Sequence, residues 1–194
     1  MLDIRKIRSE FPILNQKVWN KPFIYLDNAS TTLKPTKVIN KVQEYYSNYS
    51  ANVHRAIYAF GEKATLQYEN TRTLVKEMIN ANSEKNIIFT KGTTESINLV
   101  AYSWGRKFLK PGDEILITEM EHHSNNVPWQ MCAKDTGAII KYIPITANGE
   151  LDLTEPDRYF TPKTKLLCLI HQSNVFGTIN PIKQIINYAK NVGA

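Results

Sequence analysis

Residues 86–101 read N-I-I-F-T-K-G-T-T-E-S-I-N-L-V-A, and the fold is predicted outward from this stretch. Its first five residues are rich in β-branched side chains and predict a strand, whereas its apolar end predicts a helix. Gly92, Thr93 and Thr94 therefore occupy a strand-to-helix turn. At such a turn, free backbone N–H groups and the positive end of the helix dipole face an anion, and hydroxyl groups add donors. The stretch predicts a phosphate site; a helix with Thr94 near its N-cap is the alternative.

The spacing of the glycines restricts which class of phosphate-containing ligand this turn could bind. The turn lacks the G-x-x-x-x-G-K-[ST] pattern of a nucleotide P-loop and the G-x-G-x-x-G pattern of a dinucleotide site. A small phosphorylated cofactor therefore fits this turn better than ATP or NAD.

Strands and helices alternate after this turn, which predicts an α/β fold with helical crossovers and a mostly parallel sheet. Near-continuous apolar runs such as 166–170 predict strands buried on both faces. Two helices are expected before residue 86, one from Pro35 to Ser47 and a longer one over 56–81 with Glu69 paired to Arg72. The remaining expected elements are strands 86–90, 114–118, 138–143 and 165–170, and helices 93–104, 126–136, 154–160 and 181–191.

Composition restricts the class of protein. The chain has 194 residues, 42% of them hydrophobic and 22% charged, which is ordinary for a globular protein. The net charge is +6, but the lysines are scattered singly, so no nucleic-acid partner is expected. Cys132 and Cys168 lie in apolar stretches, which favours a reducing compartment over a disulfide framework. With a charged N-terminus and no apolar run of membrane-spanning length, we expect no membrane partner and a cytoplasmic location.

Ligands of parallel α/β sheets lie beyond the carboxyl ends of the strands. That rule places 91–96, 119–126 and 171–177 together. The middle segment contains His122 and His123; an imidazole at this edge could stack on an aromatic cofactor or move a proton. Two alternatives are a surface or helix-capping role for the pair, and a metal site that adds Glu119 and Glu121. Neighbouring histidines point in different directions, which disfavours a metal site, and no metal is expected.

Four further residues in three segments are candidates for binding. Asn174 follows strand 165–170 and could hold a ring hydroxyl or a carboxylate, although asparagine there is often only a turn former. Ala29 and Ser30 belong to Y-L-D-N-A-S-T-T (25–32), read as a short strand and a small-residue turn that lets a ligand approach closely. His54 is expected at the start of the long helix, where an anion could bind.

Together these segments resemble a known family. The stretches 25–32, 53–55 (V-H-R) and 89–101 (F-T-K-G-T-T-E-S-I-N-L-V-A) match it in order and spacing. So do E-M-E-H-H-S-N-N-V-P-W-Q (119–130) and H-Q-S-N-V-F-G-T-I-N-P-I (171–182). The chain resembles a cysteine desulfurase of the SufS type, in the class V aminotransferases of pyridoxal-phosphate fold type I. The resemblance covers essentially the whole chain.

The resemblance implies a cofactor, an activity and roles for the residues. Pyridoxal 5′-phosphate would be the cofactor, with its phosphate on Gly92, Thr93 and Thr94. His122 would stack on its ring and transfer protons, supported by His123. The family converts L-cysteine to L-alanine and passes the sulfur, as an enzyme persulfide, to an acceptor protein for iron–sulfur cluster assembly; it works as a homodimer. Asn174 would lie beside cofactor and substrate carboxylate, and Ala29, Ser30 and His54 would be at or near the substrate pocket.

The resemblance also predicts what this chain does not contain. The family's cofactor-binding lysine, its nucleophilic cysteine and its substrate-binding arginine lie in a part of the family sequence that follows the segment matched here. Residues 1–50 are expected to contribute to a small domain and the pocket edge, and 51–194 to form the first part of the cofactor-binding large domain. Selenocysteine lyase or another class V enzyme, with L-selenocysteine as an alternative substrate, and a truncated non-catalytic remnant are the competing hypotheses.

The 194-residue chain by itself is therefore expected to be inactive, because it lacks the thiolate and the lysine that the family's chemistry requires. Incubation of the chain with L-cysteine and pyridoxal phosphate, followed by quantification of alanine, tests this expectation. Alanine release above a no-protein control would contradict it.

Overall fold

The computed structural model describes residues 2–194, which form two compact units, one up to Ile88 and one from Phe89 to Ala194. The predicted boundary after residue 50 lies inside the first unit, and the predicted division into a small and a large domain stays a prediction. Among the described residues, no helix is both long enough and apolar enough to cross a membrane.

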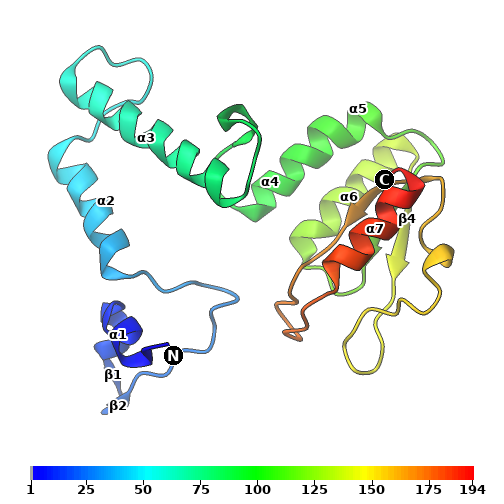
Figure 1. Cartoon of the computed structure of the whole chain (residues 1–194), viewed down its shortest axis with the longest axis horizontal. Helices are drawn as coiled ribbons and strands as arrows, with labels where there is room; N and C mark the ends of the chain where they lie inside the picture. Colours follow the sequence, from blue (N-terminus) through cyan, green and yellow to red (C-terminus); the bar gives the residue numbers. More distant parts are fainter. Residues whose placement is uncertain (1) are drawn as a thin grey trace. The chain divides into compact units, whose positions relative to one another are not determined.

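The first unit is mainly helical (Figure 1). It opens with α1 (Ile4–Ser9), whose first turn is capped by Asp3 accepting from Lys6 N at 3.1 Å. An antiparallel hairpin follows, with Trp19 and Asn20 at φ 50° and 62° in its turn, the left-handed geometry that two-residue hairpins favour. The other elements are η1 (Pro12–Asn15), β1 (Lys17–Val18), β2 (Lys21–Pro22), α2 (Thr36–Asn48), α3 (Ala59–Met78) and η2 (Glu84–Asn86).

Helix α3 confirms the long helix, but not its start or the burial of its apolar stripe. It begins at Ala59, so His54, with φ 69°, lies in the turn before it and not at its first residue. The predicted pair of Glu69 and Arg72 is present at 3.2 Å. Of the apolar stripe, Ala64 is buried but Met78 is 88% exposed. Helical periodicity thus predicted the helix, whereas burial also requires a surface to pack against.

The second unit contains a parallel sheet, as predicted. Strand β3 lies between β4 and β5, and both pairings are parallel. Four elements predicted for this unit agree with the structure to within one residue at each end: β3 (Glu114–Thr118), β4 (Ile139–Ile143), α6 (Val127–Thr136) and α7 (Ile182–Val192). Strand β5 (Thr164–Cys168) is also confirmed, ending two residues earlier than predicted.

Helices cover both faces of this sheet. Alternate side chains of β3 point to opposite faces and so enter two different cores. Ile115 and Ile117 pack with Trp129 and Cys132 of α6, whereas Leu116 packs in a second cluster. The second cluster includes Ile143 of β4 and Ile185 of α7. Figure 1 shows α6 and α7 beside the strands.

Three predicted elements are wrong: two expected strands are absent, and one expected helix is only a 3-10 turn. The expected strand 86–90 is absent: a 3-10 turn, η2, ends at Asn86, and residues 87–90 are irregular. The short strand expected within 25–32 is also absent, although its turn forms. A β-branched run becomes a strand only beside a partner with free backbone groups, and no described segment pairs with either run. The expected helix 154–160 is only the 3-10 turn η5 (Pro156–Arg158).

The predicted helix 93–104 is also divided. It comprises α4 (Thr93–Val100), a π-helical turn (Ala101–Gly105) and α5 (Arg106–Phe108). In the π turn, the Ala101 carbonyl accepts from the Cys132 thiol, with 3.5 Å between Sγ and O. A π turn inserts one residue into a helix, which changes the face that the following residues present.

At the amino end of the sheet, the carboxylate of Glu114 connects all three strands. It is buried and pairs with Lys141 of β4 at 2.9 Å. It also accepts hydrogen bonds from Thr161 at 2.6 Å and from Thr164 of β5 at 3.4 Å. Burial opposes the charged form, but the hydrogen bonds from Lys141 and Thr161 outweigh it, so the pKa of Glu114 lies below its ordinary value.

The Glu114→Gln variant is expected to lower the free energy of unfolding at pH 7 by about 1–3 kcal/mol, because these donors lose a charged acceptor. A carboxyl whose pKa is lowered on folding stabilises above its unfolded pKa, and this stabilisation is lost as the pH falls through the folded value. The difference between wild type and variant should therefore shrink below about pH 4. Urea unfolding at several pH values measures it.

Glu150→Gln, the same change on an exposed carboxylate, is the matched control. Equal destabilisation by the two variants at pH 7 would show that the Glu114 network contributes nothing specific.

Candidate functional site

The segment after β3 carries the two histidines. His122 is the N-cap of η4 (His123–Asn125), and its Nδ1 accepts from the Ser124 backbone N–H at 3.1 Å. Ser124 Oγ lies 2.9 Å from the same nitrogen. His122 therefore has the capping role considered from the sequence, and it caps η4 through Nδ1. Because Nδ1 is an acceptor here, the neutral ring carries its proton on Nε2.

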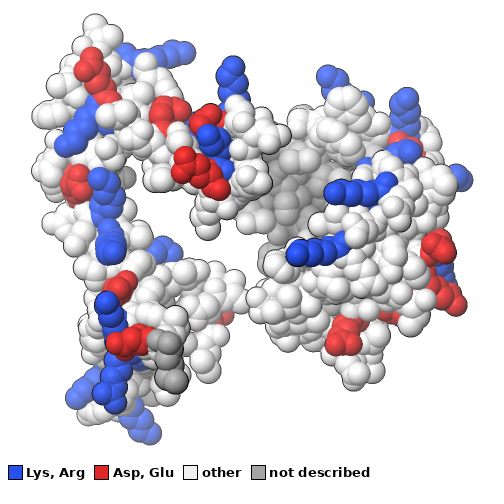
Figure 2. Space-filling model, in the orientation of Figure 1, with Lys and Arg blue, Asp and Glu red and all other residues white. Residues whose placement is uncertain are grey.

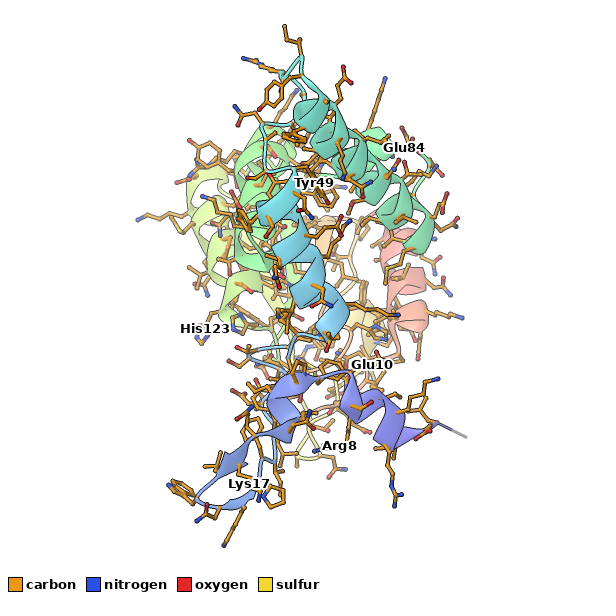
Figure 3. All side chains as sticks on the ribbon, turned by 90° about the vertical axis from the view of Figure 1, so that its left-hand side faces the viewer. Arg8, Glu10, Lys17, Tyr49, Glu84 and His123 are labelled. Carbon is orange, nitrogen blue, oxygen red and sulfur yellow. The ribbon has the colours of Figure 1, made fainter. Side chains whose placement is uncertain are left out.

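The two imidazoles face different directions. Their ring centroids lie 6.2 Å apart with an interplanar angle of 83°, and both side chains are exposed. Figure 3 labels His123 on the segment that follows β3. One ligand ion therefore does not face both rings in this geometry.

Glu119 and Glu121, the other two members of the alternative metal site, are engaged elsewhere. Glu119 Oε2 accepts from Ile145 N at 3.1 Å, and Glu121 accepts three hydrogen bonds from protein donors. Among the described residues, no group of three or more His, Cys, Asp or Glu side chains is arranged to hold a metal ion.

The segment after β5 is a tight loop organised by Ser173 and Asn180. The buried Ser173 hydroxyl accepts from the backbone N–H groups of Val175 and Phe176 at 3.2 and 3.1 Å. Asn180, also buried, donates to Ile170 O at 2.7 Å. Ser173, rather than Asn174, is therefore the turn former. The exposed Asn174 amide makes no hydrogen bond with residues 2–194 and is available to a ligand.

The amino end of α4 has the features of the predicted phosphate site. Gly92 is the N-cap, and no side chain caps the helix, so the alternative with Thr94 as a capping residue is not seen. The first N–H groups of a helix have no acceptor within it, and here they are exposed together with the Thr93 and Thr94 hydroxyls. A Cβ added at Gly92 would meet nothing within 4 Å, so open space lies above this turn.

The other candidates belong to the first unit. Ala29 and Ser30 lie in an exposed turn in which Ser30 N donates to Asp27 O at 3.2 Å. His54 Nε2 lies 3.5 Å from Glu69 Oε1, and its ring meets Tyr68 edge-on at 5.5 Å. These contacts account for the orientation of His54 without a ligand.

Within the second unit, the structure brings several predicted residues to one region. Helix α4 contacts η4, so the phosphate turn and the histidine pair belong to neighbouring segments. The loops that carry His122 and Asn174 follow the adjacent strands β3 and β5 at the same edge of the sheet. Sequence reasoning considered Glu121 only as a metal ligand and did not single out Asn125 and Trp129, which continue its hydrogen-bond chain. Their spacing of four residues was a usable signal.

Similarity to known proteins shows the family of the chain. The model of the family described as aminotransferase class-V matches residues 24–194. The chain belongs to this family. It is 48% identical over 190 residues to the cysteine desulfurase of Yersinia pseudotuberculosis, covering 98% of this chain and 47% of that relative.

Solved structures of class-V relatives show the same fold. The apo cysteine desulfurase of Thermococcus onnurineus has a TM-score of 0.90 and 37% identity, over 100% of this chain and 46% of that chain. The Escherichia coli cysteine desulfurase CsdA has a TM-score of 0.85 and 38% identity, over 100% of this chain and 47% of that chain. These likenesses confirm the predicted α/β fold. The chain spans about half the length of the relatives it matches.

Neither cysteine of this class-V chain is suited to act as a nucleophile. Cys132 and Cys168 are free and buried, and burial raises the pKa of both thiols. A reactive cysteine requires an accessible thiolate. In the native protein both thiols are therefore expected to react with iodoacetamide at least about a hundredfold more slowly than free cysteine.

Labelling with and without urea, followed by mass spectrometry of the two cysteine peptides, tests this expectation. Both peptides should be modified only after unfolding. Rapid native labelling of either cysteine would contradict the assignment.

Proposed function

We propose that the whole protein is a pyridoxal-phosphate-dependent cysteine desulfurase that converts L-cysteine to L-alanine and transfers the sulfur as an enzyme persulfide. Membership of the class-V family and the relatives named cysteine desulfurase support this function. The observation that carries the proposal within this chain is the open amino end of α4 beside the segment that presents His122. An anion site next to an imidazole is suited to a phosphorylated aromatic cofactor.

The residues present fit the cofactor. Gly92, Thr93 and Thr94 would hold the phosphate through backbone N–H groups and two hydroxyls, and the dipole of α4 favours a negative charge there. Bound pyridoxal phosphate supplies an electron sink for bond cleavage at the substrate amino acid. Asn174, with its free amide, would donate to an oxygen of the cofactor or of the substrate carboxylate.

His122 has a defined task in this scheme. With Nδ1 held by Ser124, Nε2 is the ring nitrogen left for the reacting centre. Nε2 would give its proton from the doubly protonated ring, in which Nδ1–H donates to Ser124 Oγ, and the neutral ring so formed would take a proton back at Nε2. The turn also fixes the plane of the ring, which allows it to stack on a flat cofactor. His123, whose ring is nearly perpendicular, would support the turn without sharing this role.

The substrate end and the partners are proposed from the resemblance. Ala29, Ser30 and His54 would line or adjoin the pocket for L-cysteine. The sulfur would leave the substrate through attack by an accessible thiolate, which neither Cys132 nor Cys168 supplies, and pass to an acceptor protein for iron–sulfur cluster assembly. A homodimer and a cytoplasmic location remain predictions. On the face drawn in Figure 2, Lys and Arg side chains lie singly among Asp, Glu and uncharged residues. The absence of a nucleic-acid partner stays a prediction.

Alanine release from L-cysteine, together with sulfide release when a thiol reductant is added to reduce the persulfide, tests the function on the protein as its gene encodes it. His122→Ala is expected to lower kcat about 100-fold or more while cofactor stays bound, because a proton-transfer group is lost. His123→Ala is the matched control and should stay within a few-fold of wild type. Parallel assays with L-selenocysteine separate the lyase alternative.

A protein that binds the cofactor but releases no alanine from L-cysteine would refute the proposed reaction. Equal losses in the two histidine variants would refute the role given to His122.

A further inference from the structure

The side chain of Glu121 connects three segments of the second unit. Its Oε1 accepts from Thr118 Oγ1 at the end of β3 and from Ile170 N just beyond β5, both at 2.6 Å. Its Oε2 accepts from Asn125 Nδ2 at 2.7 Å. One half-buried carboxylate therefore holds the end of one strand, the loop after its neighbour, and the start of the segment that leads into α6.

The hydrogen-bond chain continues into the core. Trp129 Nε1 donates to Asn125 Oδ1 at 3.1 Å, and the Trp129 side chain is buried against Ile115 and Ile117 of β3. This indole fixes the orientation of the Asn125 amide, with its oxygen toward Trp129 and its nitrogen toward Glu121. Glu121, Asn125 and Trp129 thus form a directed relay with one allowed pattern of donors and acceptors.

We propose that Glu121 is a positioning residue that sets the place of His122 relative to Asn174; this rests on the proposed function. The bond between Glu121 and Asn125 closes a five-residue loop that contains His122 and its partner Ser124. The bond to Ile170 N fixes the other loop four residues before Asn174. Both site-bearing loops are therefore attached to the same carboxylate, although Glu121 itself is assigned no contact with cofactor or substrate.

The relay requires one group that only accepts hydrogen bonds, a carboxylate, at either position 121 or position 125, and an amide at the other. In a Glu121→Gln variant, the new amide nitrogen would face Asn125 Nδ2, so two donors would meet. A flip of Asn125 would relieve this contact but would turn its nitrogen toward the Trp129 N–H. An Asn125→Asp variant instead places two carboxylates together without a proton between them. Each single change leaves a group unsatisfied, which costs far more than an exchanged hydrogen bond.

The double variant Glu121→Gln with Asn125→Asp satisfies every member of the relay again. The introduced amide oxygen would accept from Thr118 and Ile170, and the introduced amide nitrogen would donate to the new carboxylate, which also accepts from Trp129. The exchanged pair keeps the shape and the net charge of the original. Positioning through the relay therefore predicts that the two single variants are impaired and the double variant is restored.

The test uses the protein as its gene encodes it, freed of bound cofactor, and 4′-deoxypyridoxine 5′-phosphate as the probe, because it lacks the aldehyde and binds without a covalent bond. Calorimetry should show about tenfold weaker probe binding in each single variant and recovery to within about threefold in the double variant. Binding of inorganic phosphate, which senses only the turn at Gly92, should be unchanged in all three.

A second measurement follows the geometry directly. The Trp129 indole N–H and the His122 ring resonances in NMR spectra should shift in both single variants and return in the double variant. Glu114→Gln is the matched control, since it weakens the other end of β3 and should move neither resonance nor probe affinity. If the single variants unfold, recovery of fold and probe binding in the double variant supports the proposal.

Wild-type behaviour of Glu121→Gln in both measurements would overturn the positioning role, as would a double variant more impaired than either single variant. Failure of the wild-type protein to bind the probe would count against the proposed function alone. In that case the His122 resonance, displaced by each single change and restored by the pair, still decides whether Glu121 positions the loop.

Discussion

The second unit depends on the burial of β3 between two parallel neighbours. All five of its residues are buried, and its side chains enter two separate cores, so α6 and α7 are each fixed against an opposite face. Apolar side chains removed from water contribute roughly 25 cal/mol per Å². This central strand also fixes the edge at which the site forms, because the segments after β3 and β5 emerge side by side from paired strands.

Polar side chains then convert that edge into a defined geometry. Ser173 and Asn180 bind groups of the segment after β5, whereas Glu121 connects the segment after β3 to Ile170 N of the neighbouring one. These hydrogen bonds leave the His122 ring and the Asn174 amide exposed. At the amino end of α4 no side chain caps the helix, so its first backbone N–H groups are also left for a ligand. The supporting residues are thus satisfied within the protein, and the proposed binding residues are left for a ligand.

The sequence predicted elements well where a local pattern is sufficient. The runs that became β3 and β4 are short and apolar, and Gly137 ends α6 with the left-handed geometry that glycine favours. The sequence predicted elements less well where strand formation depends on a partner distant in the chain. Residues 86–90 have the pattern of a strand, but no described segment pairs with them. The site residues at the sheet edge follow from topology. The relay through Glu121 could not be predicted from topology. In the sequence alone Glu121 reads as a possible metal ligand, and only the structure shows its three hydrogen-bond donors.

A parallel sheet can mispair by two residues without exposing an apolar side chain, because a shift of two returns each side chain to its original face. The apolar pattern of β3 therefore does not discriminate against that error. Glu114 at one end of the strand and Glu121 just beyond the other each depend on donors from the β5 side. A two-residue slip would separate both carboxylates from these donors, at a cost of about 1–3 kcal/mol each. The two carboxylates, at the start of β3 and just beyond its end, therefore discriminate the native register from a two-residue slip, whereas the apolar middle of the strand does not.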